Sequence, residues 1–118
     1  MTDVHLQHAT TRDLLCWVFR RYRRFRVTGD SMLPTLPPNS EVLINLQSYL
    51  KHLPHAEDIV VAYHPLQPQL RIVKRVKSVD SDGACFLSGD NERDSQDSRH
   101  FGLVPLVAII GKVHCLLP

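Results

Sequence analysis

The sequence contains no apolar run long enough to cross a membrane. Its best apolar run, LLCWVF, has six residues, whereas a membrane-spanning helix needs about 20. The acidic and polar start, MTDVHLQHATTRD, lacks the basic region of a signal peptide. We therefore expect a soluble, cytoplasmic protein.

Cysteine is also scarce. The residues Cys16, Cys85 and Cys115 are odd in number and far apart, which argues against a disulfide framework and for a reducing compartment. No CxxC or paired Cys/His spacing suggests zinc. No metal or other cofactor is therefore expected.

The composition is that of one ordinary globular domain. The chain has 118 residues, of which 43% are hydrophobic and 22% are charged. A net charge of +2 excludes a protein that binds polyanions over its whole surface. The charge is uneven, however, because five arginines fall within residues 20–26, whereas residues 90–97 are rich in acids.

The N-terminal segment, residues 1–26, combines a helical pattern with these arginines. Leu14, Val18 and Tyr22 would share one face of a helix that spans about residues 11–23. The arginines would form its solvated end, since cations are favoured at a helix C-terminus. Weak contact with an anionic membrane surface is the alternative.

The rest of the chain, residues 27–118, has β patterning. Stretches rich in Val, Ile and Leu are separated by Pro, Gly, Asn and Asp. This predicts a mainly β fold, a small antiparallel domain with one N-terminal helix. The expected strands lie in residues 41–46, 58–64, 70–79, 84–89 and 108–117.

One of these strands, LRIVKRVKSV, carries a lysine out of phase with the other cations. Because side chains alternate across a strand, Lys74 shares a face with Ile72 and Val76, whereas Arg71 and Arg75 lie on the other face. Burial disfavours an ammonium group, and a neutral amine is a general base. The alternative is that Lys74 snorkels to the edge of the sheet with only its stem buried.

A serine in the stretch GDSMLPTL is the group that such a base could activate. Ser31 stands between Asp30 and Met32, and Ser-Lys pairs are a recognised variant of the serine-protease constellation. The stretch is also typical of a plain turn, because Gly, Asp, Ser and Pro all favour turns. Both interpretations of Ser31 stay open on these residues alone.

Taken together, these segments resemble the type I signal peptidase family of Ser-Lys endopeptidases. The nucleophile motif of that family, S-M-x-P-T-L, matches residues 31–36, and its G-D-I-V-V box resembles EDIVV at residues 57–61. Its K-R-V box matches residues 74–76. Its last box matches GDNERDSQDSRHFGLVP at residues 89–105. The four boxes stand in the family's order and cover most of residues 27–113.

The sequence departs from the membrane-bound members of the family. Those members carry N-terminal spans and usually a second β region between the base and the last box, whereas here only residues 76–88 fill that gap. This compact form is similar to the members that mature nickel-type superoxide dismutase. The resemblance implies a protein partner, the nickel superoxide dismutase precursor, whose N-terminal propeptide is removed to expose the nickel-binding His-Cys N-terminus.

The resemblance also implies roles for individual residues. Ser31 would be the nucleophile, with its backbone N–H in the oxyanion hole, and Lys74 would be the base. The extra hydroxyl that some members place in this hole would fall at Gly29, so it is missing here. Met32 would help to wall the substrate pocket.

The last box would support the site. Ser95 would orient the amine of the base, and a turn at Asp90 and Asn91 would return the chain toward it. Asp97 and Arg99 would brace the site. Because one residue separates them, they could share a strand face.

Two other functions stay open. One is a general signal peptidase that acts at a membrane surface through the arginines. The other is a non-catalytic or self-cleaving module, like the repressor protease domains of similar fold. Those usually follow a DNA-binding helix-turn-helix, and the thirty residues before Ser31 leave little room for one. Nucleic acid is therefore not expected as a partner.

Overall fold

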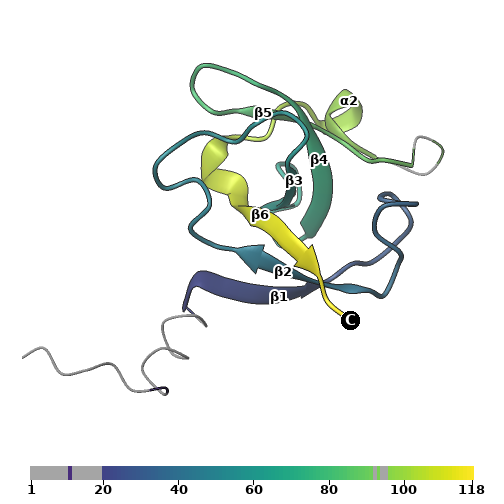
Figure 1. Ribbon diagram of the computed structural model, residues 1–118. Helices are drawn as coiled ribbons and strands as arrows, with labels where there is room; N and C mark the ends of the chain where they lie inside the picture. Colours follow the sequence, from purple (N-terminus) through teal and green to yellow (C-terminus); the bar gives the residue numbers. More distant parts are fainter. Residues whose placement is uncertain (1–10, 12–19, 92, 94–95) are drawn as a thin grey trace, which may run out of the picture.

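Six strands form one antiparallel sheet in the order β1-β2-β6-β3-β4-β5. The computed structural model describes residues 11, 20–91, 93 and 96–118. Figure 1 shows a curled sheet, with β5 at the top of the view, β1 at the bottom and β6 crossing between them. The strands are β1 Tyr22–Arg26, β2 Glu41–Asn45, β3 Ile59–Tyr63, β4 Arg71–Val79, β5 Cys85–Ser88 and β6 Ile109–Leu116.

The predicted mainly β, antiparallel fold is confirmed. Each of the five predicted strands is present, and none of their ends differs from the prediction by more than one residue. Two short helical segments follow β5, namely α2 (Ser98–Phe101) and the 3₁₀ turn η2 (Leu106–Ala108). No helix among the described residues is long and apolar enough to cross a membrane.

The predicted N-terminal helix is wrong at its end. Arg20 and Arg21 are helical, but the next five residues form β1 and pair with β2. Strand pairing places Phe25 opposite Val42, where its ring packs against the core. Arginines are tolerated here because β1 is an edge strand, where charged side chains are common. Residues 12–19, which carry most of the predicted helix, lie outside the described residues.

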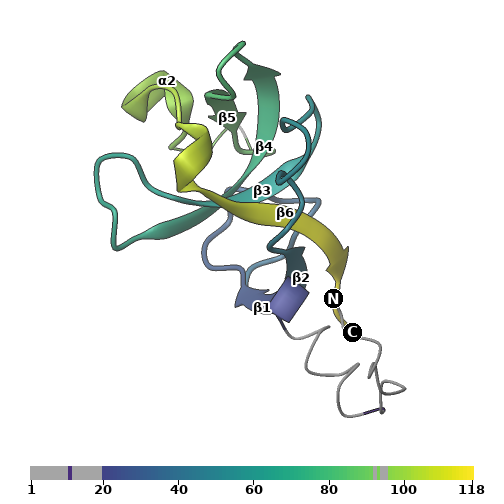
Figure 2. The same cartoon turned by 90° about the vertical axis from the view of Figure 1, so that its left-hand side faces the viewer.

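The core consists of two clusters on either side of the curled sheet. In Figure 2, β1 and β2 lie below β6 in the view, and β4 and β5 lie above it. The first cluster includes Met32 and Leu36, so it anchors the loop between β1 and β2. The second cluster joins β3, β4 and β5 to the segment after α2. Its members are Val60, Ala62, Val76, Cys85, Leu87 and Val104.

Candidate active site

Ser31 begins a turn in the loop that follows β1, with four residues between it and the end of the strand. The Leu33 amide donates to the Asp30 carbonyl (3.1 Å), and the Leu36 amide donates to the Met32 carbonyl (2.8 Å). Met32 is fully buried, whereas Ser31 is partly exposed. The turn is therefore fixed to the core from one side and presents the serine hydroxyl on the other.

Lys74 lies in the middle of β4, opposite Val60 of β3. Only 4% of its surface is exposed, so the prediction that Lys74 lies on a buried face is confirmed. The alternative, an amine that reaches solvent at the sheet edge, does not fit this exposure. The opposite face is not purely a solvent face, because Val73 is also buried and belongs to the first core cluster.

Ser31 and Lys74 line the same cleft, which has a volume of about 230 Å³. The cleft lies between the end of β1 and the start of β4. Hydrogen bonds between catalytic groups are often long in substrate-free enzymes and shorten when substrate binds, so a shared cleft is the geometry to expect here. The Ser-Lys dyad thus stays a prediction that the shared cleft allows.

Asp90 joins the strand that carries Lys74 to the loop that carries Ser31. Its carboxylate accepts two hydrogen bonds from the Arg75 guanidinium (2.8 Å each) and one from the Thr35 hydroxyl (2.6 Å). These bonds, led by that from Arg75, lower the pKa of Asp90 even though burial opposes the change. Arg75 follows Lys74 in the chain, so Asp90 connects the base strand to the turn of Ser31.

Asn91 fixes the same turn from another direction. Its backbone amide donates to the Ser31 carbonyl (2.8 Å), and its side chain donates to the Asp30 carbonyl (3.0 Å). The last box therefore contacts the peptide group that supplies the Ser31 N–H, through its Asp30 carbonyl, and also the peptide group that follows it. Among the described residues that N–H donates to no acceptor, as an oxyanion donor should in the absence of substrate.

Asp97 and Arg99 form an ion pair, but on a helix rather than a strand. Asp97 caps α2 by accepting from the Arg99 amide (3.0 Å), and its carboxylate also accepts from the Arg99 guanidinium (3.0 and 3.1 Å). Their predicted common strand face is therefore wrong. Burial favours a higher pKa for Asp97, but the hydrogen bonds from Arg99 and the charges of Arg99 and Lys74 together lower it.

Two of the predicted site residues are not placed in the cleft. Ser95, the expected orienting hydroxyl, lies outside the described residues. Met32, the expected pocket wall, packs in the core and does not line the cleft. Any effect of Met32 on substrate would therefore act through the position of the neighbouring serine.

Sequence reasoning missed the polar lining of the cleft. Thr28, His64, Arg71 and Gln96 line it together with the two predicted catalytic residues. The Nδ1 atom of His64 accepts from the backbone amides of residues 66 and 67 (3.1 and 3.2 Å), which fixes the orientation of its ring. These residues are distant in sequence and share no motif, so no sequence signal could have grouped them.

Gly29, two residues before Ser31, has a positive backbone φ angle. Its φ is 78°, and a Cβ at this position would contact nothing within 4 Å. A side chain here would be limited by backbone strain and not by space. Apart from Ser31, Thr28 is the only hydroxyl-bearing residue among those that line the described part of the cleft. It could take the place of the missing donor.

Comparison with known proteins identifies the family. The signal peptidase, peptidase S26, family model matches residues 14–82 and 77–117. The chain therefore belongs to this family. The matched regions include all the boxes that carry the resemblance and every strand of the sheet. Among the described residues, no group of three or more His, Cys, Asp or Glu side chains could hold a metal ion.

Curated relatives of this S26 chain come from eukaryotes and a cyanobacterium. It is 34% identical over 110 residues, covering 75% of this chain and 64% of the relative, to mitochondrial inner membrane protease subunit 1 of Xenopus tropicalis. It is 33% identical over 107 residues (72% and 63%) to mitochondrial ATP-independent inner membrane protease subunit 1b of Arabidopsis thaliana. It is 26% identical over 128 residues (72% and 65%) to a probable signal peptidase I-1 of Synechocystis. The chain thus spans just under two thirds of the length of these relatives.

Proposed function

We propose that this chain is a Ser-Lys endopeptidase that removes the N-terminal propeptide of the nickel superoxide dismutase precursor. The observation that carries the catalytic part is the buried Lys74 in the same cleft as Ser31. The hydrogen bonds of Asp90 and Asn91 support it, because they hold the base strand and the nucleophile turn together. Membership of a peptidase family agrees with this activity.

The mechanism uses the two cleft residues in turn. Ser31 Oγ attacks the scissile carbonyl carbon while neutral Lys74 Nζ takes its proton. The Ser31 N–H donates to the resulting oxyanion. The C–N bond then breaks, and the lysine returns the proton to the leaving amine. Water, activated by the same amine, hydrolyses the acyl-enzyme and regenerates the hydroxyl.

The substrate assignment rests on the compact form of the sequence. Only residues 76–88 separate the base from the last box, and this compactness resembles the members that mature nickel superoxide dismutase. In this proposal the protease works in the cytoplasm on a precursor that has not yet bound nickel. Cleavage creates the free α-amine that the His-Cys N-terminus needs as a ligand.

A second candidate is a general signal peptidase-like protease at a membrane surface. It is favoured by the names of the relatives, which are inner membrane protease subunits and a probable signal peptidase. The exposed side chains of Arg20, Arg24 and Arg26 would face anionic lipid in that case. Cosedimentation with vesicles containing phosphatidylglycerol would support this candidate.

Co-expression with the nickel superoxide dismutase precursor tests the substrate. Intact-mass measurement should show loss of the propeptide with the wild type and none with Ser31→Ala. A precursor with a scrambled propeptide serves as the matched control and should stay intact. An uncut natural precursor beside active wild-type enzyme would contradict the substrate assignment.

A further inference from the structure

A second hollow lies at the opposite end of β1 from the catalytic cleft. Its volume is about 510 Å³, compared with about 230 Å³ for the cleft. Its walls come from the residue before β1, the end of β2, the turn that follows β2, and β6. We call it the basic hollow because its lining includes Arg21, Lys51, His52, Lys112 and His114.

None of the described residues that line the basic hollow is acidic. Lys112 Nζ is 3.4 Å from the carboxylate of Asp58, which lies outside the lining and partly neutralises it. Lys51 is exposed and has no ion pair among the described residues. The hollow therefore keeps a positive potential, which attracts carboxylates or phosphates.

Polar groups in the hollow suit carboxylate oxygens. Asn45 Oδ1 already accepts from the Gln47 amide (2.9 Å), so the Asn45 side-chain NH₂ is the group left to donate. Gln47 is exposed and adds a second amide. Cations and NH₂ donors around one space are the groups that bind carboxylates by charge-assisted hydrogen bonds.

An apolar hollow of about 210 Å³ adjoins the basic hollow and shares Leu50 with it. Leu50 is 74% exposed, and Val107 on the other wall is 90% exposed. Large exposed apolar side chains beside a polar rim mark interaction surfaces. The ligand should therefore have an apolar group next to its negative charges.

We propose that the two hollows together bind an extended acidic segment of a protein. Its carboxylates would occupy the basic hollow, and an apolar side chain next to them would occupy the apolar hollow. A peptide can enter concave surfaces such as these, whereas a flat bilayer cannot follow them. The concave shape thus favours a peptide over an anionic lipid surface.

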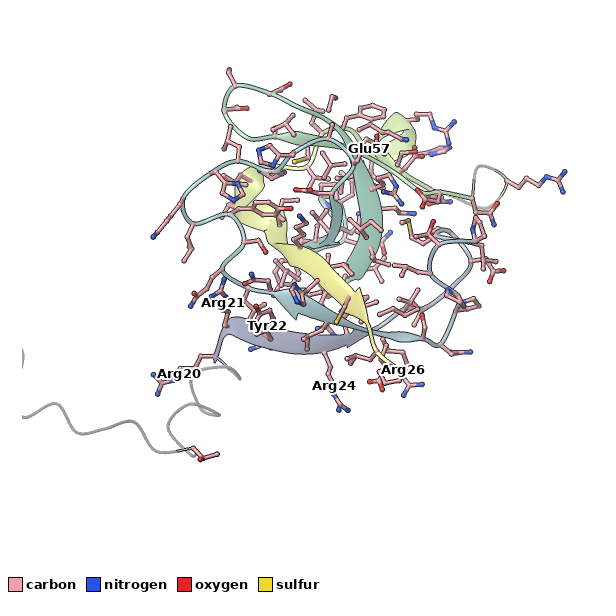
Figure 3. All side chains as sticks on the ribbon, viewed as in Figure 1. Arg20, Arg21, Tyr22, Arg24, Arg26 and Glu57 are labelled. Atoms are coloured by element: carbon pink, nitrogen blue, oxygen red, sulfur yellow. The ribbon has the colours of Figure 1, made fainter. Side chains whose placement is uncertain are left out.

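This surface is remote from the bond that is cut. Arg21 lines the basic hollow and Thr28 lines the catalytic cleft, and seven extended residues span about 23 Å. Figure 3 shows Arg21 at the start of β1, with Arg24 and Arg26 projecting from the strand on the way to the cleft. The assignment of this segment to the protease substrate rests on the proposed function, whereas the binding of an acidic segment to the two hollows does not depend on it.

Binding can be measured without cleavage, in full-length Ser31→Ala protein. The probe is a fluorescein-labelled peptide of glutamates followed by leucines, read by fluorescence anisotropy at low salt. We expect affinity in the micromolar range. Lys51→Glu should weaken it about tenfold and Leu50→Ser about threefold, whereas Lys77→Glu, an exposed lysine on β4, should change it less than twofold.

Three outcomes would overturn the proposal. They are no binding, equal binding by Lys51→Glu and Lys77→Glu, and tighter Lys51-dependent binding to phosphatidylglycerol vesicles than to the peptide. Circular dichroism checks the fold, and Lys51→Gln should give a smaller loss in the same direction. Because Ser31→Ala is used throughout, failure of the proposed protease function would leave this result unchanged.

Discussion

Replacing Asp90 by alanine should loosen the junction between the base strand and the nucleophile turn. The substitution removes two hydrogen bonds from Arg75 and one from Thr35. Arg75 keeps one bond, to the Glu57 carbonyl (2.9 Å). The Arg75 side chain is only 19% exposed, and the acid that would remain near its guanidinium is the largely exposed Glu57, at 3.9 Å.

The expected cost of Asp90→Ala is about 2–3 kcal/mol in the free energy of unfolding. A hydrogen bond to a charged group contributes about 1.5–3 kcal/mol, and breaking a fully buried ion pair costs about 3–5 kcal/mol. We expect a cost below about 5 kcal/mol because Arg75 keeps one hydrogen bond and because the Arg75–Asp90 pair is partly exposed. We also expect kcat/KM to fall at least tenfold, since a misplaced catalytic group is costly.

Urea unfolding followed by circular dichroism measures the stability, and peptide cleavage measures kcat/KM. Asp82→Ala, an exposed acid in the turn before β5, is the matched control and should cost less than about 0.5 kcal/mol. A double-mutant cycle with Thr35→Val should show coupling of at least about 0.5 kcal/mol. A loss of unfolding free energy for Asp90→Ala no larger than that for Asp82→Ala would refute this reasoning.

Three further predictions concern the rest of the site. Arg99→Met should cost about 2–3 kcal/mol in urea unfolding, because the buried Asp97 carboxylate loses both of its hydrogen bonds from the guanidinium; a cost below about 1 kcal/mol would contradict this. The lowered pKa of Asp97 stabilises the fold above about pH 4, and this contribution is lost as the pH falls through its folded-state value. Asp97→Asn should therefore flatten the acid limb of a stability–pH curve, and an unchanged limb would refute the assignment. Thr28→Val should lower kcat about tenfold to a hundredfold in the cleavage assay if its hydroxyl completes the oxyanion hole; an unchanged kcat would exclude that role.

The sequence reveals most of the sheet because five strands are rich in Val, Ile and Leu and are separated by turn residues. In β4 the alternation of side chains across the strand identifies Lys74 as a cation on an apolar face, and its burial confirms that inference. β1 escapes detection because its sequence, YRRFR, places only Phe25 against the core among its arginines. Pairing with β2 decides its conformation, and local propensity carries no sign of that partner.

The site is harder to predict than the strands because its contacts join distant segments. The sequence predicts a turn at Asp90 and Asn91. The hydrogen bonds that these two residues make to Thr35, Arg75 and the Ser31 carbonyl depend on the curvature of the sheet, which the sequence pattern does not show. α2 has only four residues, too short for a helical period. The motifs still point to Ser31 and Lys74, which line one cleft of the folded chain.

The pH dependence of cleavage of one peptide substrate tests the Ser31–Lys74 dyad most directly. Purified wild type, Ser31→Ala and Lys74→Ala would be compared, with Lys77→Ala as the matched lysine control. The wild-type rate should rise with pH as the lysine amine loses its proton, and both dyad variants should lose at least about 10³-fold in kcat at every pH. Lys77→Ala should match wild type. Cleavage by Ser31→Ala or Lys74→Ala within tenfold of the wild-type rate would contradict the dyad.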